Sequence, residues 1–501
     1  MSNSSIKKLA GQTMWYGLSS IAAKFINYLL TPLLTYNLAH TSDYGKNGLI
    51  YSAIPILNIV FTYGFETSYF RFSSQVKSKI VLYSTAAWSL FFSTIILTYI
   101  LWNNRFGFAK IVGLDDVQQI VNISIFIIAL DALSAIPFAK LRQEERPVKF
   151  AFIKIASIVI NIFVTWFFIA YAPKHSQKFQ EGLMQYIYNP QTNPIVYVVM
   201  ANLIQSAITL VLLGKEISSI KLKFNFKLWG EMMIYSLPLI IVGMGGMVNE
   251  TFDRLMLRWW LPGNVLLREE QVGIYNACYK LSILITLFIQ AFRMGAEPFF
   301  FKQAEGNNPQ RIYARVMKFF VIVICTMFLV VSLYIPVWRY FIKHTYWEGL
   351  KVVPVLLLAN MFLGIYYNLS IWYKLSNKTM AGAWITITGA LITVIINYFF
   401  VPYFSYAACA WATFSCYGSM MVFSFLWGQK EYRIPYAWKK LTAYIVIVVL
   451  LFFIHKAILH FYNHLMFSLI LATCLLLAFM WFVLQVEKKE FKKLPIIGKY
   501  I

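Results

Sequence analysis

The sequence predicts an all-α membrane protein that crosses the bilayer about fourteen times, because three observations agree. Hydrophobic residues make up 59% of the 501 residues and charged residues only 13%, whereas a soluble domain carries about 25% charged residues. Apolar segments of about 20 residues, long enough to cross a bilayer core, recur along the whole chain. Lysine and arginine concentrate in every second loop between these segments. A polytopic membrane protein satisfies all three observations.

The predicted spans divide into two lobes of six helices and a C-terminal pair. They lie near residues 11–36, 45–67, 80–102, 118–139, 150–171, 194–214, 231–252, 272–292, 316–337, 350–373, 381–401, 405–427, 441–459 and 465–486. We expect the lobes at residues 1–225 and 226–430, and the additional helices with a basic tail at residues 431–501. The first apolar segment is longer than a signal-peptide core and carries Lys24, so we expect it to remain as a span.

The placement of the basic residues predicts the orientation. A formal net charge of +24 could indicate nucleic-acid binding, but the charges alternate loop by loop and do not form one basic face. With the N-terminus in the cytoplasm, the basic loops all fall on the cytoplasmic side, and an even number of spans returns the C-terminus there. No nucleic-acid partner is expected.

Two stretches suggest that the chain contains an internal repeat. Residues 271–298 read QVGIYNACYKLSILITLFIQAFRMGAEP, and residues 43–67 read DYGKNGLIYSAIPILNIVFTYGFET. Gly45 and Tyr51 are six residues apart, as are Gly273 and Tyr279. Each stretch ends in Gly-x-Glu. A repeat of half the chain length is the usual plan of a secondary transporter, and six spans per half predict parallel lobes. Chance similarity between apolar helices is the alternative.

Five basic residues inside or at the ends of spans are candidates for substrate binding, since a charge at mid-bilayer costs about 2.5–3.5 kcal/mol. Lys24 is the most informative, because Ser20, Lys24, Asn27 and Thr31 form one polar stripe on a helix. If they share one cavity, a cationic ladder for an anionic substrate consists of Lys154, Lys24, Lys280, Arg254 and Arg258. The alternatives are an ion pair of Lys24 with Asp131, a Lys154 that reaches water, and arginines that cap the membrane interface.

Five acidic residues are candidates for gating or for coupling to an ion. They are Glu66, Asp131, Glu250, Asp253 and Glu297. Glu66 and Glu297 follow the repeat glycines and are expected at helix ends. Glu250 precedes Arg254 by four residues, the favourable order for an ion pair on one helix.

The sequence contains no pattern of catalytic chemistry. The five cysteines lie in apolar segments at spacings that fit neither a metal site nor disulfides. No Gly-rich phosphate loop is present, and the longest loop, near 172–193, is too short for a catalytic domain. We therefore expect no catalytic residues, no metal, no cofactor and no enzymatic activity.

Several stretches carry a family resemblance. They are GQTMWYGLSSIAAKFINYLLTPLLTYNLAHTSDYG from residue 11, DALSAIPFAKLRQEERP from residue 131, and FDRLML followed by VGIYNACYKL from residues 252 and 272. With the fourteen-span plan, the chain resembles the polysaccharide-transporter branch of the multidrug/oligosaccharidyl-lipid/polysaccharide exporter superfamily, in particular O-antigen and capsule repeat-unit flippases. Lys24, Lys280 and Arg254 match that family's cavity cations in type and approximate depth.

The resemblance implies the following expectations. The fold is MATE-like, with two six-helix lobes around a cavity. The protein sits in the bacterial inner membrane and exports an undecaprenyl-pyrophosphate-linked oligosaccharide by alternating access. Membrane lipids, a glycan polymerase with its export machinery, and a coupling H+ or Na+ are the implied partners. Three alternatives stay open: a peptidoglycan lipid-precursor flippase, a MATE-type cation-coupled drug antiporter, and a scaffold that transports nothing.

Overall fold

The computed structural model describes residues 21–22, 24–73, 75–175, 187–304, 308–376, 378–462 and 464–491. These residues form helices joined by short loops, and they contain no β-strand, which confirms the all-α class. In chain order the helices of the first half are α2 (Leu30–Asn37), α3 (Thr41–Thr62), α4 (Phe65–Ser73), α5 (Lys79–Asn103), α6 (Arg105–Val112), α7 (Gln118–Gln143), α8 (Pro147–Trp166), the π-helical η1 (Phe167–Tyr171), α9 (Pro194–Leu212) and α10 (Gly214–Ile217).

The second half continues in the same way. Its helices are α11 (Phe226–Glu250), α12 (Asp253–Trp260), α13 (Val265–Gln303), α14 (Pro309–Ser332), α15 (Ile335–Trp338), the 3-10 turns η4 (Arg339–Phe341) and η5 (His344–Val352), α16 (Val353–Leu369), α17 (Ile371–Leu375), α18 (Thr379–Phe404), α19 (Tyr406–Glu431), α20 (Trp438–Phe461), α21 (Leu465–Val486) and α22 (Lys488–Phe491).

Within the described residues, 12 helices are long and apolar enough to cross a membrane, or 13 if the bent pair α3 and α4 counts as one span. These thirteen correspond one by one to the predicted spans from 45–67 onward. Of the predicted first span, near 11–36, residues 11–20 and 23 lie outside the described part. The polytopic character of the chain therefore agrees with the prediction.

Local sequence explains where several helices begin and end. The side chain of Asn225 caps α11 by accepting a hydrogen bond from the main-chain N–H of Leu228. Proline occupies the first position of α8 and of α9, where its missing N–H costs nothing. Between α3 and α4 the chain bends by 42°, because Tyr63 and Gly64 both have positive φ. Glycine tolerates that conformation, and Tyr63 is fixed by packing and by a hydrogen bond to Ser89.

Contacts between Cα atoms divide the chain into two compact units. One unit comprises the residues up to Ala277 together with Thr386–Cys416, and the other comprises Cys278–Ile385 together with the residues from Tyr417 onward. The division passes through α13, α18 and α19. The six-helix lobes of residues 1–225 and 226–430 therefore stay a prediction.

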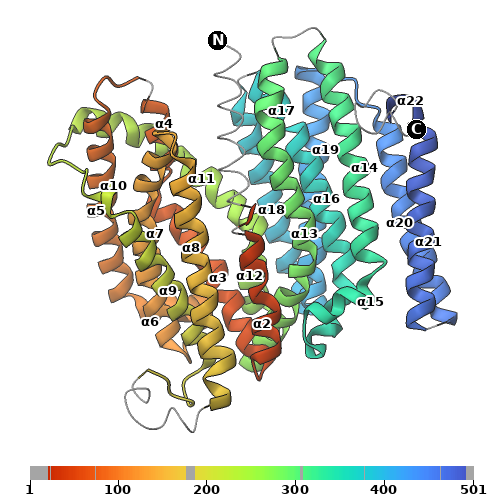
Figure 1. The fold of residues 1–501 in the computed structure, drawn as a ribbon, viewed down its shortest axis with the longest axis horizontal. Helices are drawn as coiled ribbons and strands as arrows, with labels where there is room; N and C mark the ends of the chain where they lie inside the picture. Colours follow the sequence, from red (N-terminus) through yellow and green to blue (C-terminus); the bar gives the residue numbers. More distant parts are fainter. Residues whose placement is uncertain are drawn as a thin grey trace. The chain divides into compact units, whose positions relative to one another are not determined.

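The first unit is built around α7, which packs against α3, α5 and α9, while α8 packs against α9 (Figure 1). Helix α11 packs against α3, α4 and α5. A buried apolar cluster supports this arrangement, with Phe65, Tyr69, Leu82 and Met232 among its members.

In the second unit, α14 packs against α16 and against the C-terminal hairpin of α20 and α21 (Figure 1). Glu487, at the end of α21, is 2% exposed and joins the three helices. Its carboxylate accepts hydrogen bonds from Lys318 of α14 at 2.8 Å and from Tyr444 of α20 at 2.7 Å, and it pairs with Lys440 at 2.6 Å. The additional helices are thus held to the unit by a buried carboxylate as well as by apolar contact.

Candidate functional site

A polar cluster lies inside the membrane-spanning helices of the first unit, around Asp131 of α7. The Ser206 hydroxyl of α9 donates a hydrogen bond to Asp131 Oδ1 at 2.8 Å, and Asn58 of α3 also hydrogen-bonds to this carboxyl group. Lys154 of α8 interacts electrostatically with the same group, and its ammonium lies 4.2 Å from the Phe138 ring centre. Four helices therefore contribute to one charged site.

Uncharged groups extend this cluster along α3 and α9. Asn202 donates its side-chain N–H to the Tyr51 hydroxyl at 2.9 Å, and Tyr51 is close enough to Asp131 for the two to interact electrostatically. The side chains of Asp131, Lys154, Tyr51 and Asn202 are all partly exposed. An ionic pair among neutral hydrogen-bonding groups can bind an anion through the lysine or a cation through the aspartate, and its cost in a membrane marks it as a functional candidate.

Lys24 and Lys280 occupy different units. Lys24 belongs to the helical segment 24–28 in the first unit, where its side chain and that of Asn27 are exposed and Thr31 is buried. Ser20 lies outside the described residues. Lys280 lies within α13 in the second unit and is partly exposed. The Lys24 side chain is thus accessible and the Lys280 side chain partly accessible. The cationic ladder that would join them stays a prediction.

Arg254 and Asp253 form a buried network at the start of α12. Asp253 is 2% exposed and Arg254 5%. Arg254 Nη1 donates to Asp253 Oδ1 at 2.9 Å and to the main-chain oxygen of Glu250 at 2.9 Å, while the Tyr275 hydroxyl donates to Asp253 Oδ2 at 2.6 Å. The expected Glu250–Arg254 pair along one helix assumed a continuous helix, but α11 ends at Glu250 and α12 begins at Asp253. The break turns the guanidinium toward Asp253.

Arg258 is also buried, four residues further along α12. Its guanidinium packs directly on the main chain at Gly113, where a side chain would collide with Arg258 Nε, and this explains the glycine. Gly113 has a φ of +79° as well, so two independent constraints exclude a side chain there. Both arginines are packed inside the first unit in this conformation.

Of the two acidic residues that follow the repeat glycines, the structure describes the side chain of Glu66 but not that of Glu297. Glu66, near the start of α4, pairs with Arg142 at the end of α7. The pair joins two helix ends within the first unit, in keeping with the expected helix-end position. Glu297 lies in α13, and its side chain is outside the described part of the structure.

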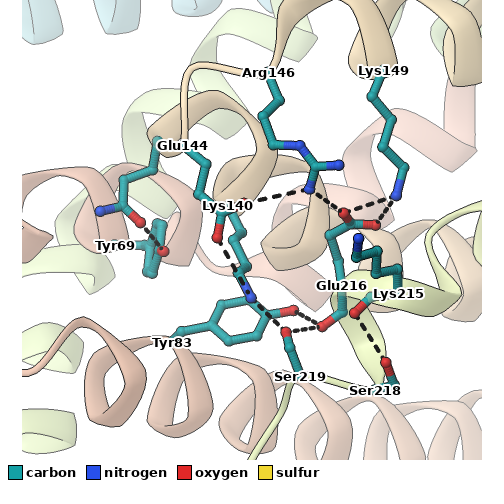
Figure 2. A network of polar contacts seen from close by, with 11 residues as sticks. Tyr69, Tyr83, Lys140, Glu144, Arg146, Lys149, Lys215, Glu216, Ser218 and Ser219 are labelled. Atoms are coloured by element: carbon teal, nitrogen blue, oxygen red, sulfur yellow. Dashed lines mark hydrogen bonds and ion pairs between the residues drawn. The ribbon is translucent and has the colours of Figure 1, made fainter.

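A second network, which the sequence analysis did not anticipate, surrounds Glu216 of α10 (Figure 2). The Glu216 side chain is 1% exposed and accepts hydrogen bonds from Arg146 at 2.9 Å and from Lys149 at 2.6 and 2.8 Å. Figure 2 shows both cations reaching this carboxylate from the start of α8. Nearby, Lys140 donates to Ser219 and the Tyr83 hydroxyl donates to the Glu216 main-chain oxygen. The sequence signal was a single acidic residue beside a loop with many basic residues.

A third network joins the beginning of α3 to the beginning of α13, and it too was missed. Lys46 forms an ion pair with Asp116, and its ammonium lies 3.8 Å from Glu269 Oε2. Asp43 accepts a hydrogen bond from Asn193 at 2.9 Å. Sequence analysis placed these residues in loops or at helix ends and gave no reason to pair residues more than 200 positions apart.

A family model described as polysaccharide biosynthesis protein matches residues 9–303, which is more than half of the chain. The chain belongs to the polysaccharide biosynthesis protein family. No curated protein matches the sequence of this family member at a significant level.

Solved structures of membrane transporters resemble this polysaccharide biosynthesis protein in fold. The structure titled lipid II flippase MurJ, inward closed conformation, has a TM-score of 0.66 at 13% identity and covers 94% of this chain and 98% of its own. A multidrug resistance MATE family transporter of the MOP superfamily in its inward-facing conformation has a TM-score of 0.62 at 12% identity, with 86% and 95% covered. An outward-facing structure with the same family description has a TM-score of 0.58 at 11% identity, with 88% and 96% covered. The MATE-like fold class is therefore confirmed.

Proposed function

We propose that this protein is a flippase that moves an undecaprenyl-pyrophosphate-linked oligosaccharide, the repeat unit of a surface polysaccharide, from the inner to the outer leaflet of the bacterial inner membrane. The observation that carries the proposal is the match to the polysaccharide biosynthesis family, in a chain whose fold resembles transporters along most of its length. The family description supports a glycan as the cargo, and the transporter-like fold supports its movement across the membrane.

The cations within the helices support an anionic substrate. Lys154 and Lys280 are partly exposed in helices that are long and apolar enough to span a membrane, and Lys24 is exposed in the predicted first span. A pyrophosphate that leaves water needs such cationic partners. Arg254 and Arg258 complete the proposed ladder when the network around them opens. The carboxylates of Glu66, Asp131, Glu250, Asp253 and Glu297 are the proposed gating or coupling groups, with H+ or Na+ as the ion.

In this proposal the two six-helix lobes alternate between inward and outward access, both termini are cytoplasmic, and a polymerase with its export machinery receives the product. No covalent step occurs, so the protein is not an enzyme. Binding energy that is equal in the two access states would not drive transport, and the coupling ion or the consumption of the product supplies the direction.

The test uses cells that lack this protein and measures two quantities, the lipid-linked oligosaccharide and the surface polysaccharide. We expect the lipid-linked unit to accumulate and the polymer to disappear, and the wild-type gene to reverse both changes. Lys24→Ala should fail to restore the polymer, because losing one charge-assisted contact of about 1.5–3 kcal/mol weakens binding roughly 10-fold or more. Lys24→Arg should retain most of the activity.

Lys456→Ala is the matched control, because it removes another exposed lysine from a membrane helix, α20, outside the proposed cavity. It should behave as wild type. Unchanged surface polysaccharide with a loss of viability and accumulation of the peptidoglycan precursor would favour the peptidoglycan flippase. Unchanged glycans with new sensitivity to cationic drugs would favour the antiporter, and full activity of every lysine variant would favour a scaffold.

A further inference from the structure

The two glycines that mark the internal repeat meet in the folded chain. A Cβ atom on Gly45 of α3 would overlap the main-chain oxygen of Glu269, and a Cβ atom on Gly273 of α13 would overlap that of Thr41. Each glycine thus makes room for the carbonyl group that lies four residues before the other glycine. Small residues at such a crossing let two helix backbones touch in a membrane.

The contact is two-fold symmetric in the repeat. A separation of 228 residues relates Gly45 to Gly273 and Thr41 to Glu269, and the same separation relates Gly48 to Asn276. Gly48 faces this equivalent residue, because a Cβ atom on it would lie 3.4 Å from Asn276 Cβ. The two copies of the repeat therefore use the same surface to contact each other, as in an isologous interface.

Charged groups beside the crossing break this symmetry. Lys46 follows Gly45 and pairs with Asp116 and Glu269, whereas the residue equivalent to Lys46 in the second repeat is Ile274. The Glu269 side chain is 3% exposed, yet its Oε1 has no hydrogen-bond partner among the described residues. Permanently packed polar groups are nearly always satisfied. An ionic contact with one unsatisfied oxygen next to a bare backbone crossing is suited to being broken and remade.

Helix α12 adds two contacts at the same end of the first unit. The Trp259 indole N–H donates to the main-chain oxygen of Ile111 at 2.6 Å, and Arg258 packs on Gly113. Arg258 Nε, like Glu269 Oε1, is buried without a hydrogen-bond partner in the described part of the chain. At this end, polar and main-chain contacts join residues of the first predicted lobe to residues of the second.

We propose that the crossing of α3 and α13 at Gly45 and Gly273, with the Lys46 ion pairs beside it, is the gate that closes one end of the transport path. We call it the glycine seam; it consists of Thr41, Gly45, Lys46, Gly48 and Asp116 with Glu269, Gly273 and Asn276. The positive-inside orientation puts this end outside, so opening the seam releases the lipid-linked glycan toward the outer leaflet. The inference rests on the proposed function, because a gate requires transport.

The test is a disulfide across the seam. The Cβ separation of 3.4 Å at Gly48 and Asn276 is close to the roughly 3.5–4.5 Å that a disulfide requires, so the variant G48C/N276C should cross-link in an oxidising compartment. The oxidised full-length variant should fail to restore the surface polysaccharide, and a reductant should return activity. The single variants G48C and N276C should be active with or without reductant. An oxidised, fully cross-linked variant that restores the polymer as well as wild type would show that the seam never opens, and would overturn the proposal.

If the reduced double variant is itself inactive, labelling of the single variant G48C decides the question. In a protein whose exposed Cys474 is replaced by serine, a membrane-impermeant maleimide added outside should react with the introduced thiol during turnover. A thiol that stays as unreactive as the buried Cys278 would refute the gate. The wild-type gene in the same cells tests the proposed function separately. Its failure to restore the surface polysaccharide would refute the flippase function, whereas the labelling result would still decide whether the glycine seam opens.

Discussion

Replacing Glu216 by glutamine is expected to destabilise the first unit measurably. The carboxylate is 1% exposed and receives Arg146 and Lys149 at 2.6–2.9 Å, so E216Q leaves two cations facing a neutral amide. Breaking one side of a fully buried pair costs about 3–5 kcal/mol. Here Arg146 is 37% exposed and Lys149 25%, so both regain water, and we expect a loss of about 2 kcal/mol.

Thermal unfolding of the purified protein in detergent measures this effect. A loss of 1 kcal/mol lowers Tm by about 2–4 °C in a domain of 150–250 residues and by less in a longer chain, so the expected decrease is roughly 2–4 °C. E144Q is the matched control, because Glu144 is 38% exposed and contacts the same Arg146 at 3.5 Å. Such a pair contributes about 0–1 kcal/mol, and its loss should be barely detectable. Equal decreases for E216Q and E144Q would refute the reasoning from burial.

Three further predictions concern other parts of the chain. Burial would raise the pKa of Glu487, but hydrogen bonds from Lys318, Lys440 and Tyr444 outweigh this effect and hold the pKa below 4.5. In thermal unfolding, the difference in stability between wild type and E487Q should therefore be largest at neutral pH. It should disappear as the pH falls below 4.5. The double variant D131N/K154Q should give more folded protein in membranes than either single variant, since each single change leaves an unbalanced charge in a span. A smaller amount of folded protein for the double variant than for both single variants would contradict this. Gly364→Val should cost about 1–3 kcal/mol, because a Cβ atom would lie 2.8 Å from Phe320 Cζ, and an unchanged Tm would mean that α13 and α14 yield more readily than packed helices do.

The fold could be predicted from the sequence because the bilayer imposes a simple length rule. A run of about 20 apolar residues must cross as a helix whatever its neighbours are, so the spans from 45–67 onward matched helices in the structure. The bend at Tyr63 was not predictable from periodicity. It depends on two residues with positive φ, only one of which is glycine.

The site was harder to predict, because charge partners depend on tertiary contacts. Asp131 and Lys154 were correctly singled out as charges within spans, but Ser206, Asn202 and Tyr51 gave no signal that they would surround Asp131. For Arg254 the helix break before Asp253 redirected the side chain, and nothing in the spacing of NETFDRL shows a break. The repeat revealed Gly45 and Gly273 as equivalent positions, but similarity between two segments does not say that they touch.

The continuity of α13 has a mechanical consequence. Its 39 residues make a rod of about 58 Å, nearly twice the thickness of the hydrocarbon core. The helix belongs to one compact unit up to Ala277 and to the other from Cys278, and α18 and α19 also continue from one unit into the other. Any rotation of one unit against the other must therefore deform α13, α18 and α19 where they pass from one unit into the other. A displacement of one end of such a helix, in one unit, would then be transmitted to its other end in the second unit.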